Sequence, residues 1–212
     1  KLKNKTVTAH CPNPGSMIKL LDKGNPVWIT KSKNVHRKLK YTLQIIQVDK
    51  IKICINTHVT NKIVQESINK GSIKELKNFN IIRPEKKFGE NTRFDFFLLN
   101  KVTNKKAFLE VKSVSLQRKN YHAEFPDSVT SRGKKHLENL VIANKQGYES
   151  YLFFLIQIEK CKSFAIASDI DPEYFKVFNS ALKKNINVIC YDCKFTNKGI
   201  EINKKIDLFN ER

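Results

Sequence analysis

The stretch "FLEVKSV", residues 108–114, places a carboxylate and an amine two positions apart inside an apolar segment. In a β-strand, residues i and i+2 point to the same face, so Glu110 and Lys112 would lie side by side. Such a pair is either a surface ion pair in a lysine-rich chain or half of a catalytic site. The spacing alone does not decide, because the same acid-x-Lys pattern recurs at 75–77, 85–87 and 192–194.

A second acid, Asp95, lies inside the apolar stretch "RFDFFLL" that precedes this segment. Strands that are apolar on both faces are interior strands of a sheet. An ionised carboxylate in such a place is costly unless it has a hydrogen-bonding partner, a cation or a metal. The setting of Asp95 and Glu110 therefore distinguishes them from the matches at 75–77 and 85–87, which lie in polar surroundings.

If the strands predicted over 92–100 and 106–114 pair as a hairpin, Asp95 and Glu110 converge at one end. Two such carboxylates suit Mg²⁺ or Mn²⁺, which take oxygen ligands and keep waters or substrate phosphates. We predict Asp95 and Glu110 as metal ligands. Together with Lys112, which would orient or deprotonate the attacking water, they are the predicted catalytic residues. The alternative is a buried ion-pair network among Asp95, Arg93 and Lys112.

The stretch "FPDSVTSRGKKHL" opens a helix predicted over 128–145, with Asp127 as its N-cap. Its apolar face is predicted to contain Val129, Gly133, Leu137, Leu140 and Val141. A polar flank at helical spacing borders that face and overlooks the carboxylates: Ser128, Arg132, Lys135, His136 and Asn139. Arg132 and Lys135 suit phosphate. His136 is an additional candidate that could equally be a packed histidine, and Glu90 in "FGEN" is a candidate third acid.

The remaining patterns divide the chain at about residue 56. Strands are predicted over 7–10, 26–30, 40–48 and 52–56, with a tight turn in "QVDKIK". Beyond them we predict a helix over 57–69, strands over 78–84, 92–100 and 106–114, the helix over 128–145, strands over 150–159 and 163–168, a helix over 172–185 and a strand over 186–193. The predicted fold class is α/β (α+β). A small, basic, all-β barrel over 1–56 precedes a nuclease-like α-β-β-β-α-β core with a mixed sheet over 57–212.

The charge of the chain favours a nucleic-acid partner. The formal net charge is +20, and residues 1–56 hold 12 basic and only 2 acidic residues. Lys and Arg bind phosphates by releasing counterions. The densest cluster, in "KSKNVHRKLK", gives the predicted DNA-binding residues Lys31, Lys33, Arg37, Lys38 and Lys40, to which we add Arg132 and Lys135. Compositional drift toward Lys, Asn and Ile is the competing explanation, because 34 of the 40 basic residues are Lys.

The five cysteines indicate a reducing environment, since an odd number without regular spacing does not form a disulfide framework. Cys190 and Cys193 form a C-x-x-C pair, but it lies in a predicted strand and lacks the second pair of a structural zinc site. No apolar run approaches the roughly 20 residues needed to span a bilayer. We therefore expect a cytoplasmic protein without a membrane partner.

Five motifs together resemble the sugar fermentation stimulation protein A family. They are "AHCPNPGSM" (9–17), "INTH" (55–58), "FGENTRFDFFL" (88–98), "FLEVKSV" (108–114) and "FPDSVTSRGKKHL" (125–137). The resemblance implies an N-terminal OB-fold and a domain similar to PD-(D/E)xK nucleases. Asp95 would match the conserved Asp, and Glu110 and Lys112 the E-x-K. It also implies DNA binding and a regulatory role in sugar use.

The chain departs from the family pattern at two places. Pro14 stands where the family would have Thr, and the family's opening residues, which would supply the first barrel strand, are expected to be missing. The His10–Ser16 loop is interpreted as a turn pinned by Pro12, Asn13 and Gly15, with His10 and Cys11 as ligands in the alternative.

Three hypotheses of function follow. The first is a Mg²⁺- or Mn²⁺-dependent nuclease that hydrolyses phosphodiesters in single- or double-stranded DNA. The second is a sequence-nonspecific DNA-binding regulator of sugar metabolism without catalytic turnover. The third is RNA binding. The sequence leaves the oligomeric state open.

Overall fold

The computed structural model describes residues 5–90 and 92–209, so residues 1–4 of the predicted N-terminal domain lie outside it. The N-terminal part is a four-stranded sheet of β1 (Ala9–His10), β2 (Val27–Lys31), β3 (Tyr41–Val48) and β4 (Ile51–Cys54). β3 lies at its centre, parallel to β1 and antiparallel to β2 and β4. Asp49 and Lys50, at φ 46° and 65°, form the predicted tight turn between β3 and β4.

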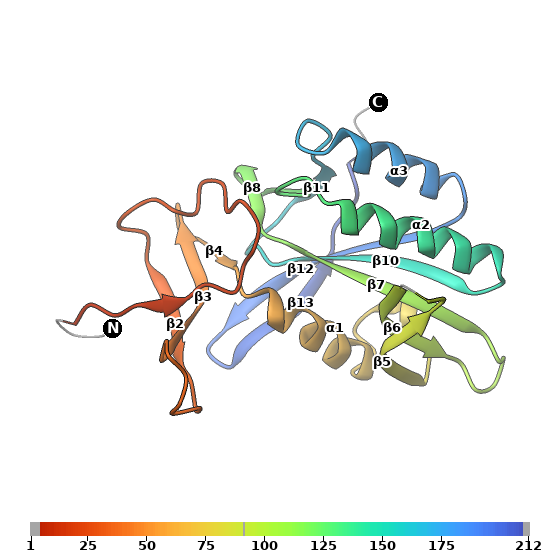
Figure 1. The fold of residues 1–212 in the computed structure, drawn as a ribbon, viewed down its shortest axis with the longest axis horizontal. Coiled ribbons are helices and arrows are strands. Elements are labelled where there is room, and N and C mark those ends of the chain that lie inside the picture. The colour runs from red at the N-terminus through yellow and green to blue at the C-terminus, as the bar shows by residue number, and fades with distance from the viewer. Residues whose placement is uncertain (1–4, 91, 210–212) are drawn as a thin grey trace.

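The larger part is built on a six-stranded mixed sheet in the order β13-β12-β10-β7-β6-β5 (Figure 1). Its strands are β5 (Ile81–Phe88), β6 (Thr92–Leu99), β7 (Lys106–Val114), β10 (Glu149–Ile156), β12 (Asn187–Thr196) and β13 (Gly199–Lys205). β7, β10 and β12 are parallel, whereas β5, β6 and β13 are antiparallel to their neighbours. The predicted α/β class with a mixed sheet is therefore confirmed.

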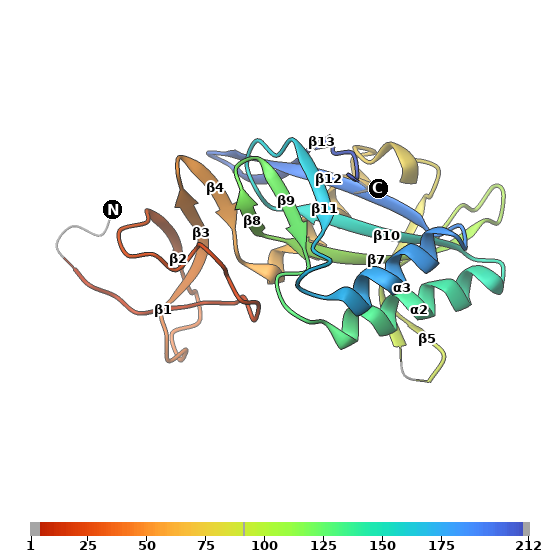
Figure 2. The same ribbon diagram turned by 90° about the horizontal axis from the view of Figure 1, so that it is seen from above.

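Helices cover both faces of this sheet. α1 (Thr60–Asn69) lies on one face, and α2 (Ser131–Lys145) and α3 (Pro172–Leu182) lie together on the other (Figures 1 and 2). The sheet divides the core into two clusters, and adjacent residues alternate between them. Phe108 and Phe154 pack on the α2 side, whereas Leu109 and Phe153 pack on the α1 side. Burial on both faces explains the continuous apolar runs in these strands.

A third sheet was not predicted. It has the order β11-β9-β8 and consists of β8 (Leu116–Lys119), β9 (His122–Phe125) and β11 (Ser163–Ile166). β8 and β9 form a hairpin between β7 and α2, and they are short and partly polar. β13 was also missed, because "GIEINKK" lacks a strong apolar pattern. The strand predicted over 78–84 occupies 81–88 instead.

The helix starts also differ from the prediction. α2 begins at Ser131, and its N-cap is Thr130 rather than Asp127, because the Thr130 hydroxyl accepts a 3.0 Å bond from the Gly133 N–H. Val129 precedes the helix and is 71% exposed, so it is not part of the apolar face. α1 begins at Thr60, three residues later than predicted, because Thr57–Val59 form a 3₁₀ turn that is capped by Asn56.

Besides the 3₁₀ turn before α1, the described residues form another over Lys74–Leu76. α3 has Pro172 at its start and Asp171 as its N-cap. None of the helices in residues 5–90 and 92–209 is long and apolar enough to cross a membrane.

Candidate active site

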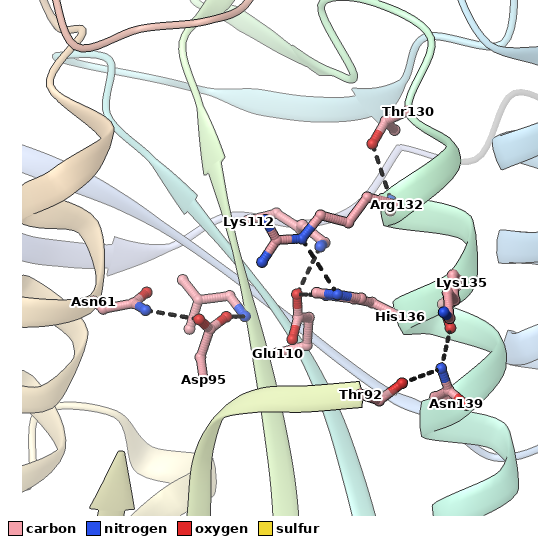
Figure 3. Close-up of polar contacts among 12 residues, drawn as sticks. Asn61, Thr92, Asp95, Glu110, Lys112, Thr130, Arg132, Lys135, His136 and Asn139 are labelled. Atoms are coloured by element: carbon pink, nitrogen blue, oxygen red, sulfur yellow. Dashed lines mark hydrogen bonds and ion pairs between the residues drawn. The ribbon is translucent and has the colours of Figure 1, made fainter. Parts of the chain in front are cut away.

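The candidate site lies where β6 separates from β7. The ladder between the two strands ends at the pair Phe96 and Leu109, and Asp95 and Glu110 are the next residues on either side. Asp95 Oδ2 accepts a 2.8 Å bond from the Val111 N–H, in place of a backbone carbonyl. Its Oδ1 accepts a 2.7 Å bond from the Asn61 side chain on α1 (Figure 3).

The backbone of β6 bends at Asp95. Two flanking pairs keep the register between β5 and β6, but the pair between Glu85 and Asp95 is missing, and Glu85 has a φ of 54°. Phe94 and Phe96 would share one face of a regular strand, yet they pack into opposite core clusters. Because of this bend, Asp95 does not pair with Glu85 in the β5–β6 ladder, and its carboxylate lies beside Glu110.

Glu110 is almost fully buried, with 3% of its surface exposed. Its Oε1 accepts a 2.8 Å bond from Lys112 Nζ and a short bond from His136 Nδ1 on α2 (Figure 3). Among the described residues, Glu110 Oε2 has no hydrogen-bond partner, although it too is buried. Three other buried side-chain oxygens among the described residues also lack a partner, but they belong to uncharged groups, in Ser150, Gln157 and Tyr174. Leaving an ionised oxygen buried without a partner is far less favourable than leaving a neutral one.

The surroundings shift the pKa values of these two carboxyls in opposite directions. Burial raises the pKa of Asp95 to about 6, and the nearby negative charge of Glu110 adds to this effect. Burial would also raise the pKa of Glu110, but the charge of Lys112 and the bond from His136 outweigh it, so that this pKa lies below its ordinary value. A cation between the two carboxyls would relieve the repulsion that disfavours an ionised Asp95.

The donor set fits a hard divalent cation. Among the described residues, no group of three or more His, Cys, Asp and Glu side chains lies together as a ready-made metal cage. Mg²⁺ does not need one, since it commonly binds one or two carboxylates and completes its shell with waters and phosphates. Asp95 and the unpartnered Oε2 of Glu110 supply such a pair, and no thiol or free imidazole nitrogen in the described part of this site favours Zn²⁺ instead.

The first turns of α2 face this pair. Arg132 Nε donates a 3.5 Å bond to His136 Nε2 (Figure 3). Because Nδ1 of the same ring is bonded to Glu110, His136 links α2 to β7. Asn139 donates to the Thr92 hydroxyl at 2.6 Å and so joins α2 to the start of β6. Of the predicted flank, Lys135 is exposed and Ser128 lies before the helix.

Some expectations about the neighbouring residues were wrong or incomplete. The buried network of Asp95, Arg93 and Lys112 does not form, because Arg93 pairs with Glu85 at the surface, 3.7 Å away. Glu90 lies exposed in the turn between β5 and β6, and among the described residues it has no ion pair. Asn61 was missed, since one polar residue on a helix carries no signal for a partner on a distant strand.

Family comparisons agree with the motifs read from the sequence. Residues 58–199 match the profile described as the sugar fermentation stimulation protein RE domain, and residues 1–55 match the SfsA N-terminal OB domain. The chain belongs to the SfsA family. A sugar fermentation stimulation protein homolog of Pelagibacter ubique is 48% identical over 99% of this chain and 90% of the relative. One from Rhodospirillum centenum is 39% identical over 95% of this chain and 86% of the relative.

A solved structure, titled as Pyrococcus furiosus SfsA in complex with Ca²⁺, has the same fold. It superposes with a TM-score of 0.87 at 20% sequence identity, and the match covers 98% of this chain and 88% of that chain. At this identity the likeness establishes the fold alone.

The SfsA-family loop at 9–17 belongs to the N-terminal part of the chain and makes hydrogen bonds to the larger part. Asn13 Oδ1 accepts a 2.8 Å bond from the Gly15 N–H, which confirms the predicted turn. The Ser16 hydroxyl donates to the Asp127 carbonyl at 2.5 Å, and the Thr57 hydroxyl donates to the Pro12 carbonyl at 2.8 Å. The loop therefore lies against the segment that precedes α2.

The basic cluster at 31–40 forms the end of the β2–β3 hairpin of the OB domain (Figure 1). Four of its cations are exposed, namely Lys31, Lys33, Lys38 and Lys40. Arg37 is half-buried and donates a 2.8 Å bond to the Thr42 hydroxyl. The hairpin belongs to a different sheet from the carboxylates, so its predicted role concerns binding rather than chemistry.

The C-x-x-C pair lies in β12, as predicted, and both thiols are buried. Burial raises the pKa of Cys190 to about 12 and that of Cys193 well above its ordinary value, so both are protonated at neutral pH.

Proposed function

We propose that this SfsA-family protein binds DNA and hydrolyses its phosphodiester bonds with Mg²⁺ or Mn²⁺ at Asp95 and Glu110. The observation that carries the proposal is the buried, unpartnered Oε2 of Glu110 beside the carboxyl of Asp95, whose pKa is raised. This free oxygen and the carboxyl of Asp95 are two oxygen ligands of the kind that Mg²⁺ binds.

The protein's own groups have distinct roles in this proposal. A divalent cation bound there would polarise the phosphate and lower the pKa of a bound water. Asn61 and the Val111 N–H orient Asp95. Lys112 and His136 fix Glu110 through Oε1. The Lys112 ammonium offsets negative charge on the phosphate and orients the attacking water, and the exposed Arg132 binds a phosphate oxygen.

Two names among the relatives support the proposal. The matching domain is described as an RE domain, and the Pyrococcus furiosus protein of the same fold is titled as a complex with Ca²⁺. Ca²⁺ and Mg²⁺ share a preference for oxygen ligands. We further propose that the protein works in the cytoplasm, since all five cysteines are free thiols.

The test is cleavage of a supercoiled plasmid in Mg²⁺ or Mn²⁺, with EDTA as the blank. We expect cleavage by the wild type, and its loss in Asp95→Asn and in Lys112→Ala. Asp22→Asn and Lys62→Ala are matched controls, because both residues are exposed and lie outside β6 and β7. Equal cleavage by all five proteins would show that the activity comes from a contaminant or from another site.

A second candidate is a DNA-binding regulator without turnover. It is favoured by the complete engagement of Lys112 and His136 with one oxygen of Glu110, which also describes a static buried ion-pair network. This candidate predicts strong DNA binding in EDTA and no cleavage with any divalent cation. Competition between DNA and RNA of equal length tests the RNA alternative in the same assay.

Under either candidate, the basic hairpin is expected to contact phosphates. Neutralising Lys31, Lys33, Arg37, Lys38 and Lys40 should flatten the slope of log K against log salt by roughly 0.9 for each phosphate that is no longer bound. An unchanged slope would place the DNA surface elsewhere on the molecule.

A further inference from the structure

A groove runs between the β5–β6 hairpin and α2, on the α2 side of the sheet. Its volume is about 980 Å³. We propose that this groove binds a single-stranded segment of nucleic acid that continues from the phosphate held at the carboxylates. The proposal takes its substrate class from the proposed function, but the binding that it describes requires neither a metal nor cleavage.

The groove adjoins the candidate site at three points. Phe108 lines it and lies two residues before Glu110 on the same face of β7. Lys135 lines it and precedes His136 on α2. The bonded pair of Thr92 and Asn139 forms part of its wall. A strand held in the groove would therefore lead directly to the carboxylates.

The charge of the groove matches a phosphate backbone. Five cations line it, and Glu90 is the only acid among its described lining residues. The cations come from β5, β7 and α2, and they are Arg83, Lys86, Lys87, Lys106 and Lys135. All five are exposed, and within residues 5–90 and 92–209 none of them is in an ion pair. Their positive charges can therefore interact with a bound ligand, because no acidic side chain of the described residues neutralises them in an ion pair.

The floor of the groove is aromatic. Phe88 and Tyr148 are half-buried, and both pack on the buried ring of Phe108, with centroid distances of 5.2 and 4.9 Å. Cations around partly exposed rings are the combination that binds single strands, in which the rings stack on bases and the cations follow the backbone. The faces of bases in a duplex are stacked on one another, so rings in a groove floor discriminate in favour of an unpaired strand.

Binding of fluorescent oligo-dT, measured by anisotropy in EDTA, tests the proposal. The triple variant Lys86→Gln/Lys87→Gln/Lys106→Gln should make the negative slope of log K against log salt shallower by roughly 2. Each phosphate contact on a single strand contributes ~0.7 to the steepness of that slope. Lys183→Gln/Lys184→Gln/Lys198→Gln is the matched control, because it removes the same charge from exposed positions at the end of α3 and in the β12–β13 turn. An equal loss of slope in both triples would overturn the proposal in favour of a general charge effect.

Tyr148→Leu separates stacking from charge. It keeps an apolar side chain at this position but removes the aromatic face, so we expect roughly tenfold weaker oligo-dT binding with an unchanged salt slope, and recovery in Tyr148→Phe. Equal weakening of duplex binding by Tyr148→Leu would refute the preference for single strands. Displacement of oligo-dT by polyglutamate as readily as by unlabelled oligo-dT would refute the nucleic-acid assignment.

Photo-cross-linking of an iodouracil oligonucleotide, followed by peptide mapping, locates the strand. Cross-links at Phe88 or Tyr148 support the groove, and cross-links only at the exposed Trp28 of the OB domain overturn it. The two proposals fail separately. Absence of plasmid cleavage with groove cross-links present would reject the nuclease alone, whereas cleavage with oligo-dT binding unaffected by the groove variants would reject the groove alone.

Discussion

The raised pKa of Asp95 predicts that its charge destabilises the metal-free fold. The pKa rises from 3.8 to about 6, so the folded protein holds this proton over a range in which the unfolded chain has lost it. Folding is then favoured below about pH 4, and that contribution is lost as the pH rises through about 6. At 1.36 kcal/mol for each unit, the ionised carboxylate costs about 3 kcal/mol at neutral pH.

Asp95→Asn removes this charge and keeps the shape of the side chain. The substituted amide oxygen can still accept from the Val111 N–H, and its NH₂ group can donate to Asn61 once the Asn61 amide is rotated. In EDTA at pH 7.5 we therefore expect the variant to be more stable than the wild type, by up to about 3 kcal/mol. For a chain of this size, that is roughly 6–12 °C in Tm.

Thermal unfolding from pH 4 to pH 8, followed by circular dichroism, checks both the size and the pH dependence. The gain should be small near pH 4, where Asp95 is protonated in the folded state and about half protonated in the unfolded chain, and should reach its full size above about pH 6. Asp22→Asn is the control, because Asp22 is an exposed carboxylate. A variant that is no more stable than the wild type at pH 7.5, or equally stabilised at all pH values, would refute the reasoning.

Divalent cations should reverse the order of stabilities. A cation that binds only the folded state at 1,000 times its Kd stabilises the wild type by about 4.1 kcal/mol, which exceeds the advantage of about 3 kcal/mol expected for Asp95→Asn in EDTA. Asp95→Asn loses one of the two proposed ligands, so we expect little response of its Tm to Mg²⁺, Mn²⁺ or Ca²⁺. Equal metal-induced shifts in both proteins would place the cation elsewhere.

Three further perturbations test the surroundings of the site. Lys112→Met should destabilise the fold by roughly 3–5 kcal/mol, because it leaves Glu110 buried without its cation, and adding Glu110→Gln should recover part of the loss in urea unfolding. Gly15→Ala should cost about 1–3 kcal/mol, since a Cβ there would lie 2.0 Å from Asp127 Oδ2, and adding Asp127→Gly should restore stability. Asp171→Ala should lower the free energy of unfolding by about 1–2 kcal/mol or more, because its carboxylate caps α3 and also accepts from the backbone before α2; an unchanged Tm would contradict both roles.

The sequence predicted the strands of the site because their signal is local. Burial on both faces gives "RFDFFLL" and "AFLEVKSV" an almost continuous apolar character, and the charged residues inside them stand out against it. The pairing of these strands followed from the short connection between them. Asp95, Glu110 and Lys112 could therefore be selected from their local surroundings, and the family motifs led to the same residues.

The hydrogen-bond partners of the site residues could not be predicted from such local patterns. The partner of His136 is 26 residues away in sequence, and the partner of Asn61 is 34 residues away. Such contacts depend on how α1 and α2 pack on opposite faces of the sheet, and no local pattern encodes that packing. The same applies to the start of α2, where Thr130 caps the helix and the Asp127 carbonyl accepts from Ser16, 111 residues away in the sequence.

The sequence by itself determined which residues are embedded in the interior strands, since hydrophobic periodicity is set by near neighbours and by burial. The tertiary structure decided what those residues do to one another. Only the separation of β6 from β7 brings Asp95 beside Glu110, and only the docking of α2 directs His136 at one oxygen of Glu110. The other oxygen is left buried and without a partner among the described residues, because the packing that fixes Glu110 supplies donors from one side alone.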